Sequence, residues 1–486
     1  MSLVQSPHPS SHKQLSYSFV KRPWLRLALL CFLLVVSVLL YLFLGSLAQP
    51  NDEYIILFIL TWLICFVPYL GACAFVLLTP APVGRWRIAE IGIILLGAFL
   101  FRALLLPQVP LLSHDSWRYV WDARVILHGY SPYVYPPESP ILKPLRDALI
   151  YGNSGYRAVP TVYPPGAEGV YVLSYLLAPS NLFVLKAIFL GFEMLTCIGL
   201  ALLLLQRGRD PRLTILYAWC PLPVIEFAIE GHLDALTITL IIFILLFATK
   251  RDRTIWWRVL LGVLIALAAL TKIYPILFLL VVTRRRDWAI PLTCFVTIAL
   301  AYIPFIVLGH GHVFGFLSTY ATEQRQNAGV VPLVIRWITS SNLHLRDQIT
   351  VLVQYIVDVL LIGPLLVVVL VLRLRERISM DAATLILIGA IYNVSTHIFP
   401  WYIPALLLFV PLLLNPLWTP KGLDGRGIVI VAVWYFVCIA PIGYFFRNAT
   451  DWTLYYTFVY SIPVFLLAVG FGCMIGKHKF AKVHQV

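Results

Sequence analysis

Residues 25–47 read LRLALLCFLLVVSVLLYLFLGSL and contain a single charged side chain, Arg26. A run of about 20 apolar residues is long enough to cross the hydrocarbon core of a bilayer as a helix. Comparable runs recur to the end of the chain, separated by short polar connections. These further candidate spans lie at 55–79, 88–106, 182–205, 213–229, 235–249, 288–308, 350–372, 382–399, 402–415, 428–446 and 452–473.

A pair of shorter apolar runs lies between Val259 and Val282 and is interrupted by Thr271-Lys272-Ile273-Tyr274-Pro275. Proline lacks a backbone donor and breaks a helix, so we expect two half-length helices that turn at Lys272. The whole chain is 60% hydrophobic and 12% charged, whereas soluble domains carry about 25% charged residues. This composition excludes a soluble enzyme and a disordered chain. It predicts an all-α polytopic membrane protein of about 12–14 transmembrane helices, with a helical outer loop after the third span.

Lysine and arginine alternate from one side of the predicted membrane to the other. If the N-terminus is inside, 24 of the 36 basic residues fall in inner segments. Basic loops favour the cytoplasm, so we predict cytoplasmic basic tails at 1–24 and 474–486 around a transmembrane domain at 25–473. The net charge of +14 then reflects sidedness, and no nucleic-acid partner is expected.

Two outer segments are long, 107–168 and 309–349. In the first, helical spacing places Asp115, Arg118, Tyr119 and Asp122 on one face of a helix that Gly129 would end. This pattern allows two interpretations. The helix could carry a functional acid, or it could lie at the membrane interface with its carboxylates paired to its own arginines.

Further polar and aromatic residues gather at the other outer turns. Tyr163 lies in one of two Tyr-Pro-Pro stretches, which either expose rings to sugars or lipid tails or act as rigid spacers. His232 and Asp234 could bind a metal, but two ligands are too few to define a site, and Asp234 could equally cap the next helix. All eight cysteines lie in apolar runs, so they indicate neither disulfides nor a thiolate metal site.

Lys272 and Tyr274 would lie at headgroup depth, where a lysine either meets a lipid phosphate or extends toward water. Arg325, in the second long segment, is another candidate for a phosphate. His397, Trp401 and Tyr402 lie at a further outer turn. Because the inner turns carry little besides Lys and Arg, the active face is predicted to be outside.

Several of these motifs together resemble the GT-C glycosyltransferases, in particular glycosyltransferase family 87 and the related polyprenol-phosphate-mannose-dependent mannosyltransferases. They occur in the family's order over 115–402, although Ala123 and Tyr130 stand where glycine and isoleucine or asparagine are usual. The motifs are Asp115-x-x-Arg118-Tyr119-x-Trp121-Asp122-x-Arg124, Gly129-Tyr130-Ser131-Pro132-Tyr133, Thr161-Val162-Tyr163-Pro164-Pro165-Gly166, Gly231-His232-Leu233-Asp234-Ala235-Leu236, Leu270-Thr271-Lys272-Ile273-Tyr274-Pro275 and Pro400-Trp401-Tyr402.

The resemblance implies a hexosyltransferase that moves a hexose such as mannose from a polyprenyl-phosphate donor to a lipid, glycan or protein acceptor, with arabinose as another sugar that the family suggests. It also implies a bacterial plasma membrane with the active site on the outer face. Asp115 matches the place of the family's catalytic acidic residue. The expected substrate-binding residues are Arg118, Tyr119, Asp122, Tyr163, His232, Asp234, Lys272, Tyr274, Arg325, His397, Trp401 and Tyr402.

The residue types suit that chemistry. A lipid phosphate leaves as a stable anion without an acid, whereas the attacking hydroxyl needs a base such as Asp115. Cations stabilise the departing phosphate, with Lys272, Arg118 and Arg325 as candidates in that order. One base without a covalent intermediate predicts inversion at the anomeric carbon. No nucleotide cofactor is expected, and a divalent metal is possible although the sequence offers no clear ligand set.

Two other classes share this topology. A lipid-linked sugar transporter or flippase would show internal repeats and ionisable groups deep in its spans. Glu193, Glu226 and Asp358 are the acidic residues well inside the predicted spans, and no convincing repeat is present. A ligase that transfers whole lipid-linked glycans would share both the topology and the outer active face.

Overall fold

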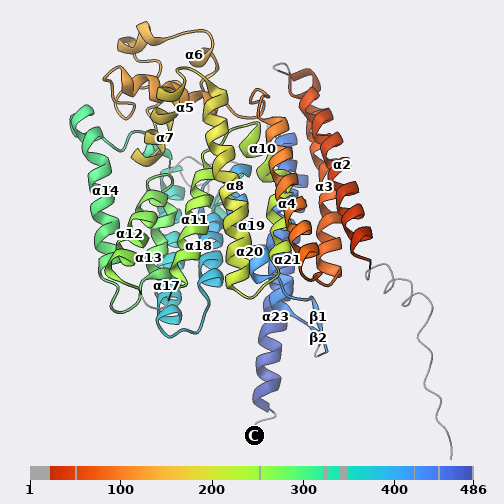
Figure 1. Ribbon diagram of the computed structural model, residues 1–486. Coiled ribbons are helices and arrows are strands. Elements are labelled where there is room, and N and C mark those ends of the chain that lie inside the picture. Colours follow the sequence, from red (N-terminus) through yellow and green to blue (C-terminus); the bar gives the residue numbers. More distant parts are fainter. Residues whose placement is uncertain are drawn as a thin grey trace, which may run out of the picture.

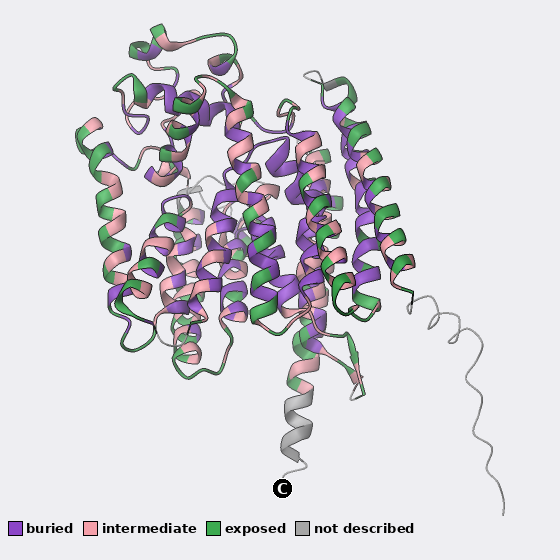
Figure 2. Ribbon diagram, viewed as in Figure 1, coloured by how far each residue is buried: buried purple, intermediate pink, exposed green. Residues whose placement is uncertain are grey.

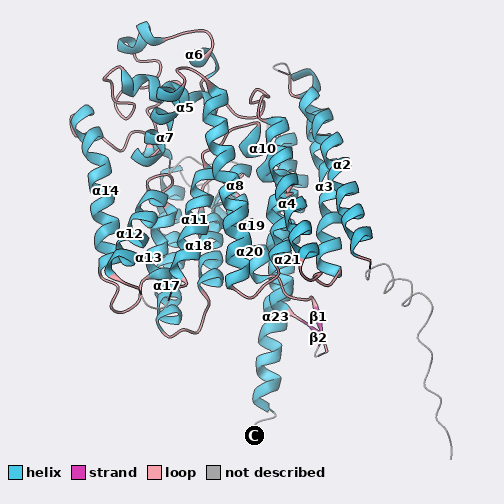
Figure 3. Cartoon of the chain, in the orientation of Figure 1, coloured by secondary structure: helices cyan, strands magenta, loops and turns pink. Residues whose placement is uncertain are grey.

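The computed structural model describes residues 22–49, 52–250, 253–320, 327–339, 347–420, 422–446 and 449–483. Across these ranges the regular elements are helices, apart from one short antiparallel hairpin formed by β1 (Trp418–Thr419) and β2 (Gly422–Leu423) (Figure 3). The predicted all-α class is therefore confirmed.

Within the described residues, eight helical stretches are long and apolar enough to cross a membrane. Each agrees with one of the predicted spans, to within a few residues at its ends. The eight are α2 (Pro23–Leu47), α3 (Ile55–Leu78), α4 (Arg85–Leu105), α8 (Leu182–Gln206), α14 (Ala289–Leu308), α17 (Asp347–Leu374), the stretch Gly425–Phe446 that starts with α21 (Gly425–Ile439), and the stretch Thr453–Gly476 that starts with α22 (Thr453–Tyr456) and continues into α23 (Ile462–Val483).

Shorter apolar helices fill the middle of the bundle. The predicted half-helix pair is present. Helix α12 ends at Ala269, the chain turns at Lys272, and a 3-10 helix followed by α13 forms the second half. Pro275 has no N–H to continue α12. The short elements are α11 (Asp234–Ala248), α12 (Ile255–Ala269), α13 (Phe278–Val282), α18 (Met380–Val394), α19 (Pro404–Leu407) and α20 (Phe409–Leu413).

Several boundaries differ from the predicted ones. The span expected at 213–229 is divided into α9 (Ile215–Ala218) and α10 (Pro221–Ala228), because Pro221 has no N–H with which to extend α9. Helix α7 (Pro165–Leu177) begins inside the predicted outer loop 107–168, with Pro165 at its first position. Helix α23 continues to Val483, beyond the expected end of the last span at 473.

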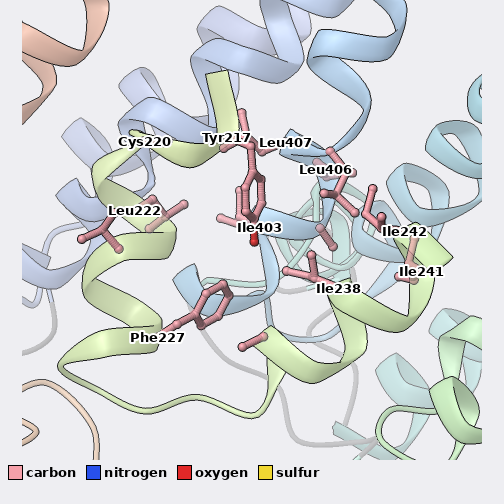
Figure 4. Close-up of a cluster of buried hydrophobic side chains, with 14 of the residues drawn as sticks. Tyr217, Cys220, Leu222, Phe227, Ile238, Ile241, Ile242, Ile403, Leu406 and Leu407 are labelled. Carbon is pink, nitrogen blue, oxygen red and sulfur yellow. The ribbon is translucent and has the colours of Figure 1, made fainter. Parts of the chain in front are cut away.

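The most buried part of the molecule is the centre of the bundle (Figure 2). Figure 4 shows Tyr217, Leu222 and Phe227 of α9 and α10 beside Ile238 of α11 and Leu406 of α19. The outer helices expose apolar side chains instead, for example on α2, α14 and α17. Such faces suit contact with lipid, where helix association depends on packing because lipid tails are as apolar as the side chains.

The ends of the bundle are built differently (Figure 1). Helices α5 (Asp115–Leu127), α6 (Ile150–Asn153) and α7 lie together at one end. The β-hairpin, the start of α2 and the end of α23 lie at the other. Helix α7 contacts the turn after α12, where the Ala167 amide donates to the Leu270 carbonyl at 3.0 Å. The α5–α7 region therefore covers the point where the half-helices turn.

Candidate active site

A cavity of about 260 Å³ lies where the α5–α7 region meets the turn after α12. Nine of the thirteen residues predicted for the site line it, so residues from four separate parts of the sequence converge here. The nine are Asp115, Arg118, Tyr119, Tyr163, Lys272, Tyr274, His397, Trp401 and Tyr402. Asp122, His232 and Asp234 are buried behind its wall, and Arg325 lies outside the described residues.

Asp115 is the first residue of α5, and its side chain enters the cavity beside two tyrosines. The Tyr163 hydroxyl donates to Asp115 Oδ2 at 3.3 Å and lies 3.4 Å from the Tyr119 hydroxyl. Burial, and then the Asp115 charge, raise the pKa of both tyrosines. Both phenols therefore stay protonated, and Tyr163 can donate to the carboxylate.

Helix α5 is not the surface helix that the interfacial interpretation required, because all residues from Ser116 to Val125 are buried. That interpretation was right about one ion pair, since Arg118 donates to Asp122 Oδ1 at 2.8 Å. The Arg118 guanidinium also donates to the carbonyls of Tyr156 and Val159, at 2.8 and 3.1 Å. Three of its five N–H groups are thus used by the protein, which leaves Arg118 a lesser candidate for a phosphate.

Asp122 does not line the cavity and contacts its wall mainly through Arg118. We expect Asp122→Asn to lower stability by about 1–3 kcal/mol, because it weakens a buried charge-assisted hydrogen bond, and to lower turnover far less than a change at Asp115. Thermal melting in detergent and a sugar-transfer assay would check both parts. An equal loss of turnover in the two variants would mean that the two carboxylates act together.

Lys272 occupies the turn between the half-helices, where it contacts two predicted site residues. Its ammonium is 2.7 Å from Asp234 Oδ1 and 3.6 Å from the centroid of the Tyr402 ring. The Tyr402 hydroxyl is in turn 2.5 Å from the Tyr320 hydroxyl. The lysine is therefore held in place by protein groups and does not extend toward water. Asp234 forms an ion pair with Lys272 and is not simply a helix cap.

His232 lies behind the cavity and supports its wall. Its ring stacks on Trp401 with centroids 4.0 Å apart, and its Nδ1 is 3.1 Å from Glu226 Oε2. Burial alone would lower the pKa of His232, but the Glu226 carboxylate reverses the effect and the pKa is raised. No group of three or more potential metal ligands occurs among the described residues.

One functional candidate, Glu230, was missed as a site residue. Its carboxylate is fully buried and accepts from three consecutive backbone amides, those of Leu111, Leu112 and Ser113, at 3.1, 3.0 and 2.9 Å. The Ser113 hydroxyl then accepts from the Asp115 amide at 3.2 Å. Glu230 therefore fixes the segment that leads into α5. Its place in Glu230-Gly231-His232-Leu233-Asp234 was the available sequence signal.

A second cavity, of about 620 Å³, reaches Asp115 from another direction. It shares Asp115, Tyr156, Phe399 and Trp401 with the first cavity. Its remaining walls are largely aromatic or polar and include Arg336 and residues from the C-terminal part of the chain. Asp115 thus stands where two cavities meet.

The fold and this site define an integral membrane protein in which a carboxylate and an ammonium face one aromatic-lined cavity at the end of a helix bundle. The family model of glycosyltransferase family 87 matches residues 161–397. This match supports the assignment of the chain to glycosyltransferase family 87, and thus to the membrane glycosyltransferases in general. Comparisons with curated proteins and with solved structures give no match. The matched region contains Lys272 and His397, whereas Asp115 and Trp401 lie outside it.

Proposed function

We propose that the protein transfers a sugar from a polyprenyl-phosphate donor to an acceptor hydroxyl, with Asp115 as general base. The observation that supports this most is that Asp115 and Lys272 line the same cavity. A carboxylate can take the proton of the attacking hydroxyl as the new bond forms. An ammonium can stabilise the charge that collects on the departing phosphate.

The donor fits the first cavity on chemical grounds. Its walls are mostly aromatic or apolar, with Lys272 as the ammonium, which suits a sugar phosphate carried on a lipid chain. Tyr163 donates to Asp115 Oδ2, so the other carboxylate oxygen can accept from the incoming hydroxyl. No second carboxylate lines this cavity among the described residues, which favours direct displacement and therefore inversion over a covalent sugar–enzyme intermediate.

The acceptor is proposed to occupy the second cavity, because the attacking hydroxyl must reach Asp115 from a side that the donor leaves open. Trp401 and Trp452 offer aromatic faces there, and Asn327 and Arg336 add polar groups. Aromatic faces with a few polar partners are suited to polyhydroxylated ligands. A lipid, a glycan or a protein could carry the accepting hydroxyl.

The transporter alternative is weakened by the contacts of Glu193 and Glu226, two of the three acidic residues inside the predicted spans; the third, Asp358, lines a cavity beside the site. Glu193 accepts from Arg102 and Tyr217 at 2.8 and 2.7 Å. Glu226 accepts from Tyr444 at 2.9 Å and pairs with His232. These carboxylates are fully buried and engaged by protein groups, so they do not line a route for an ion or a polar substrate.

The test is a sugar-transfer assay on membranes that contain the protein, with radiolabelled polyprenyl-phosphate mannose and, separately, arabinose as donor. Transfer into lipid, glycan or protein that disappears in Asp115→Asn would support the enzyme. Entry of label into sealed vesicles without transfer would support the transporter. Release of a complete lipid-linked glycan onto an acceptor would support the ligase. Accessibility of the α5–α7 region to a membrane-impermeant reagent in intact cells would test the outer location.

Glu230 should position Asp115 without touching either substrate. We expect Glu230→Gln to lower kcat about 10- to 100-fold while the donor KM stays within about twofold. The NH2 group of Gln is a hydrogen-bond donor and would face a backbone N–H, which is also a donor. Burial raises the pKa of Glu230 to about 7, with the nearby Glu226 charge adding to the rise. The comparison should therefore be made at pH 8, where the carboxylate is mostly ionised.

Glu193→Gln is the matched control for Glu230→Gln, because Glu193 is equally buried but engages Arg102 and Tyr217 within the bundle. It should lower the melting temperature without the selective loss of kcat. If kcat falls in both variants in proportion to the loss of folded protein, Glu230 has only a structural role.

A further inference from the structure

A third cavity, of about 300 Å³, lies beside the first and shares Tyr320, Ile391, Ser395 and His397 with it. Its other wall is helix α17, which contributes Val351, Gln354, Tyr355 and Asp358. These four residues follow helical spacing and form one face of α17. The rest of this helix is largely exposed, as expected for a lipid-facing span.

Two hydrogen-bond acceptors on that face stand out. Gln354 is 4% exposed, and its Nε2 donates to Asp358 Oδ1 at 2.5 Å. Its Oε1 is buried, and no partner for this atom exists in the described part of the chain. A buried acceptor without a donor costs about 1–3 kcal/mol, and a carboxylate within a span costs about 2.5–3.5 kcal/mol. The energetic cost of these two acceptors suggests that a ligand supplies hydrogen-bond donors to them.

The chemistry of the pair restricts the ligand. Gln354 gives one of its two N–H groups to Asp358. Gln354 Oε1 and the second oxygen of the ionised Asp358 can only accept. The phosphate that joins a sugar to a lipid is an anion without a hydrogen-bond donor, so it does not suit these acceptors. An isoprenoid chain also has no donor. A sugar ring offers several hydroxyl donors.

The position of the cavity indicates where the ring of the transferred sugar would lie. In an inverting displacement the attacking oxygen and the leaving phosphate lie on opposite faces of the anomeric carbon. The rest of the sugar ring must then extend to one side of the line that joins the attacking oxygen to the leaving phosphate. With the phosphate at Lys272 and the acceptor at Asp115, the third cavity opens on a further side of the same space, past Tyr320 and His397.

We propose that Gln354 and Asp358 bind hydroxyl groups of the transferred sugar and so contribute to donor specificity. This inference rests on the proposed function, since it requires a lipid-phosphate sugar in the first cavity. It assigns to α17 a role beyond spanning the membrane.

The test measures equilibrium binding to the Asp115→Asn protein, in which the expected loss of turnover preserves the bound donor. The ligands are polyprenyl-phosphate mannose and sugar-free polyprenyl phosphate. The added substitutions are Gln354→Leu and Asp358→Asn, and Thr350→Val serves as the control. Thr350 is buried on the same helix and bonds Thr339, but it does not line the cavity.

We expect Gln354→Leu and Asp358→Asn each to weaken binding of the mannosyl donor by about tenfold or more, the effect of one hydrogen bond to a charged or buried polar group. Binding of sugar-free polyprenyl phosphate should stay unchanged, and Thr350→Val should change neither. The inference is overturned if the mannosyl donor binds as before, if it binds no tighter than the sugar-free lipid in the parent protein, or if both affinities fall equally. Failure of the parent protein to bind either ligand would overturn the proposed donor itself.

Discussion

Replacing Asp115 with asparagine is expected to lower turnover about 10²- to 10⁴-fold, the range that a positioned general base contributes. The amide keeps the size of the side chain and can still accept from the Tyr163 hydroxyl. It cannot take a proton from the attacking hydroxyl at neutral pH. The loss should therefore appear in kcat, and the donor KM should change little because the lipid phosphate is held elsewhere in the cavity.

Steady-state transfer assays with the purified protein would measure this effect, and thermal melting in detergent would show that the variant is folded. Tyr163→Phe is the matched control, because it removes the hydrogen bond to Asp115 but leaves the carboxylate in place. Tyr163→Phe should lower turnover about tenfold or less, which is the net effect of losing one hydrogen bond to a charged group. Turnover within a few fold of the original in Asp115→Asn would exclude Asp115 as the base.

The sequence predicted the helical fold well because a bilayer demands long apolar helices, which are visible in one dimension. The half-helix pair at Lys272 was predicted from a proline and a charge in an apolar run. The break at Pro221 was missed, because the flanking segments are both apolar and together have the length of a span. The start of α7 was missed because Pro164-Pro165 suggests an irregular loop, although proline is also favoured at the first position of a helix.

The site was predicted less completely, and the reason is geometric. Their positions near the predicted outer turns pointed to Asp115, Lys272 and Trp401, and these three residues line one cavity. Spacing along the chain could not show that Lys272 pairs with Asp234, since these residues come from different helices. It also could not show what Glu230 contacts, because its partners are backbone amides and leave no pattern in the side chains.

Lys272→Ala is expected to have the second large effect, and it should act on both donor use and stability. The ammonium is the proposed partner of the lipid phosphate, so its loss should lower kcat/KM for the donor about 10²- to 10³-fold, as removal of a positioned electrostatic group does in other enzymes. The Asp234 carboxylate, whose side chain is 5% exposed, would lose its partner. Breaking a buried ion pair on one side costs about 3–5 kcal/mol.

A double substitution separates these two effects. Asp234→Ala alone leaves the lysine in place, and Lys272→Ala with Asp234→Ala removes the unpaired charge. Stability in the double variant should recover most of what Lys272→Ala loses, whereas donor use should stay low. Recovery of donor use together with stability would show that Lys272 only supports the fold. Lys272→Arg is a further check: it keeps the charge but changes its shape, so it should retain part of the donor use that Lys272→Ala abolishes.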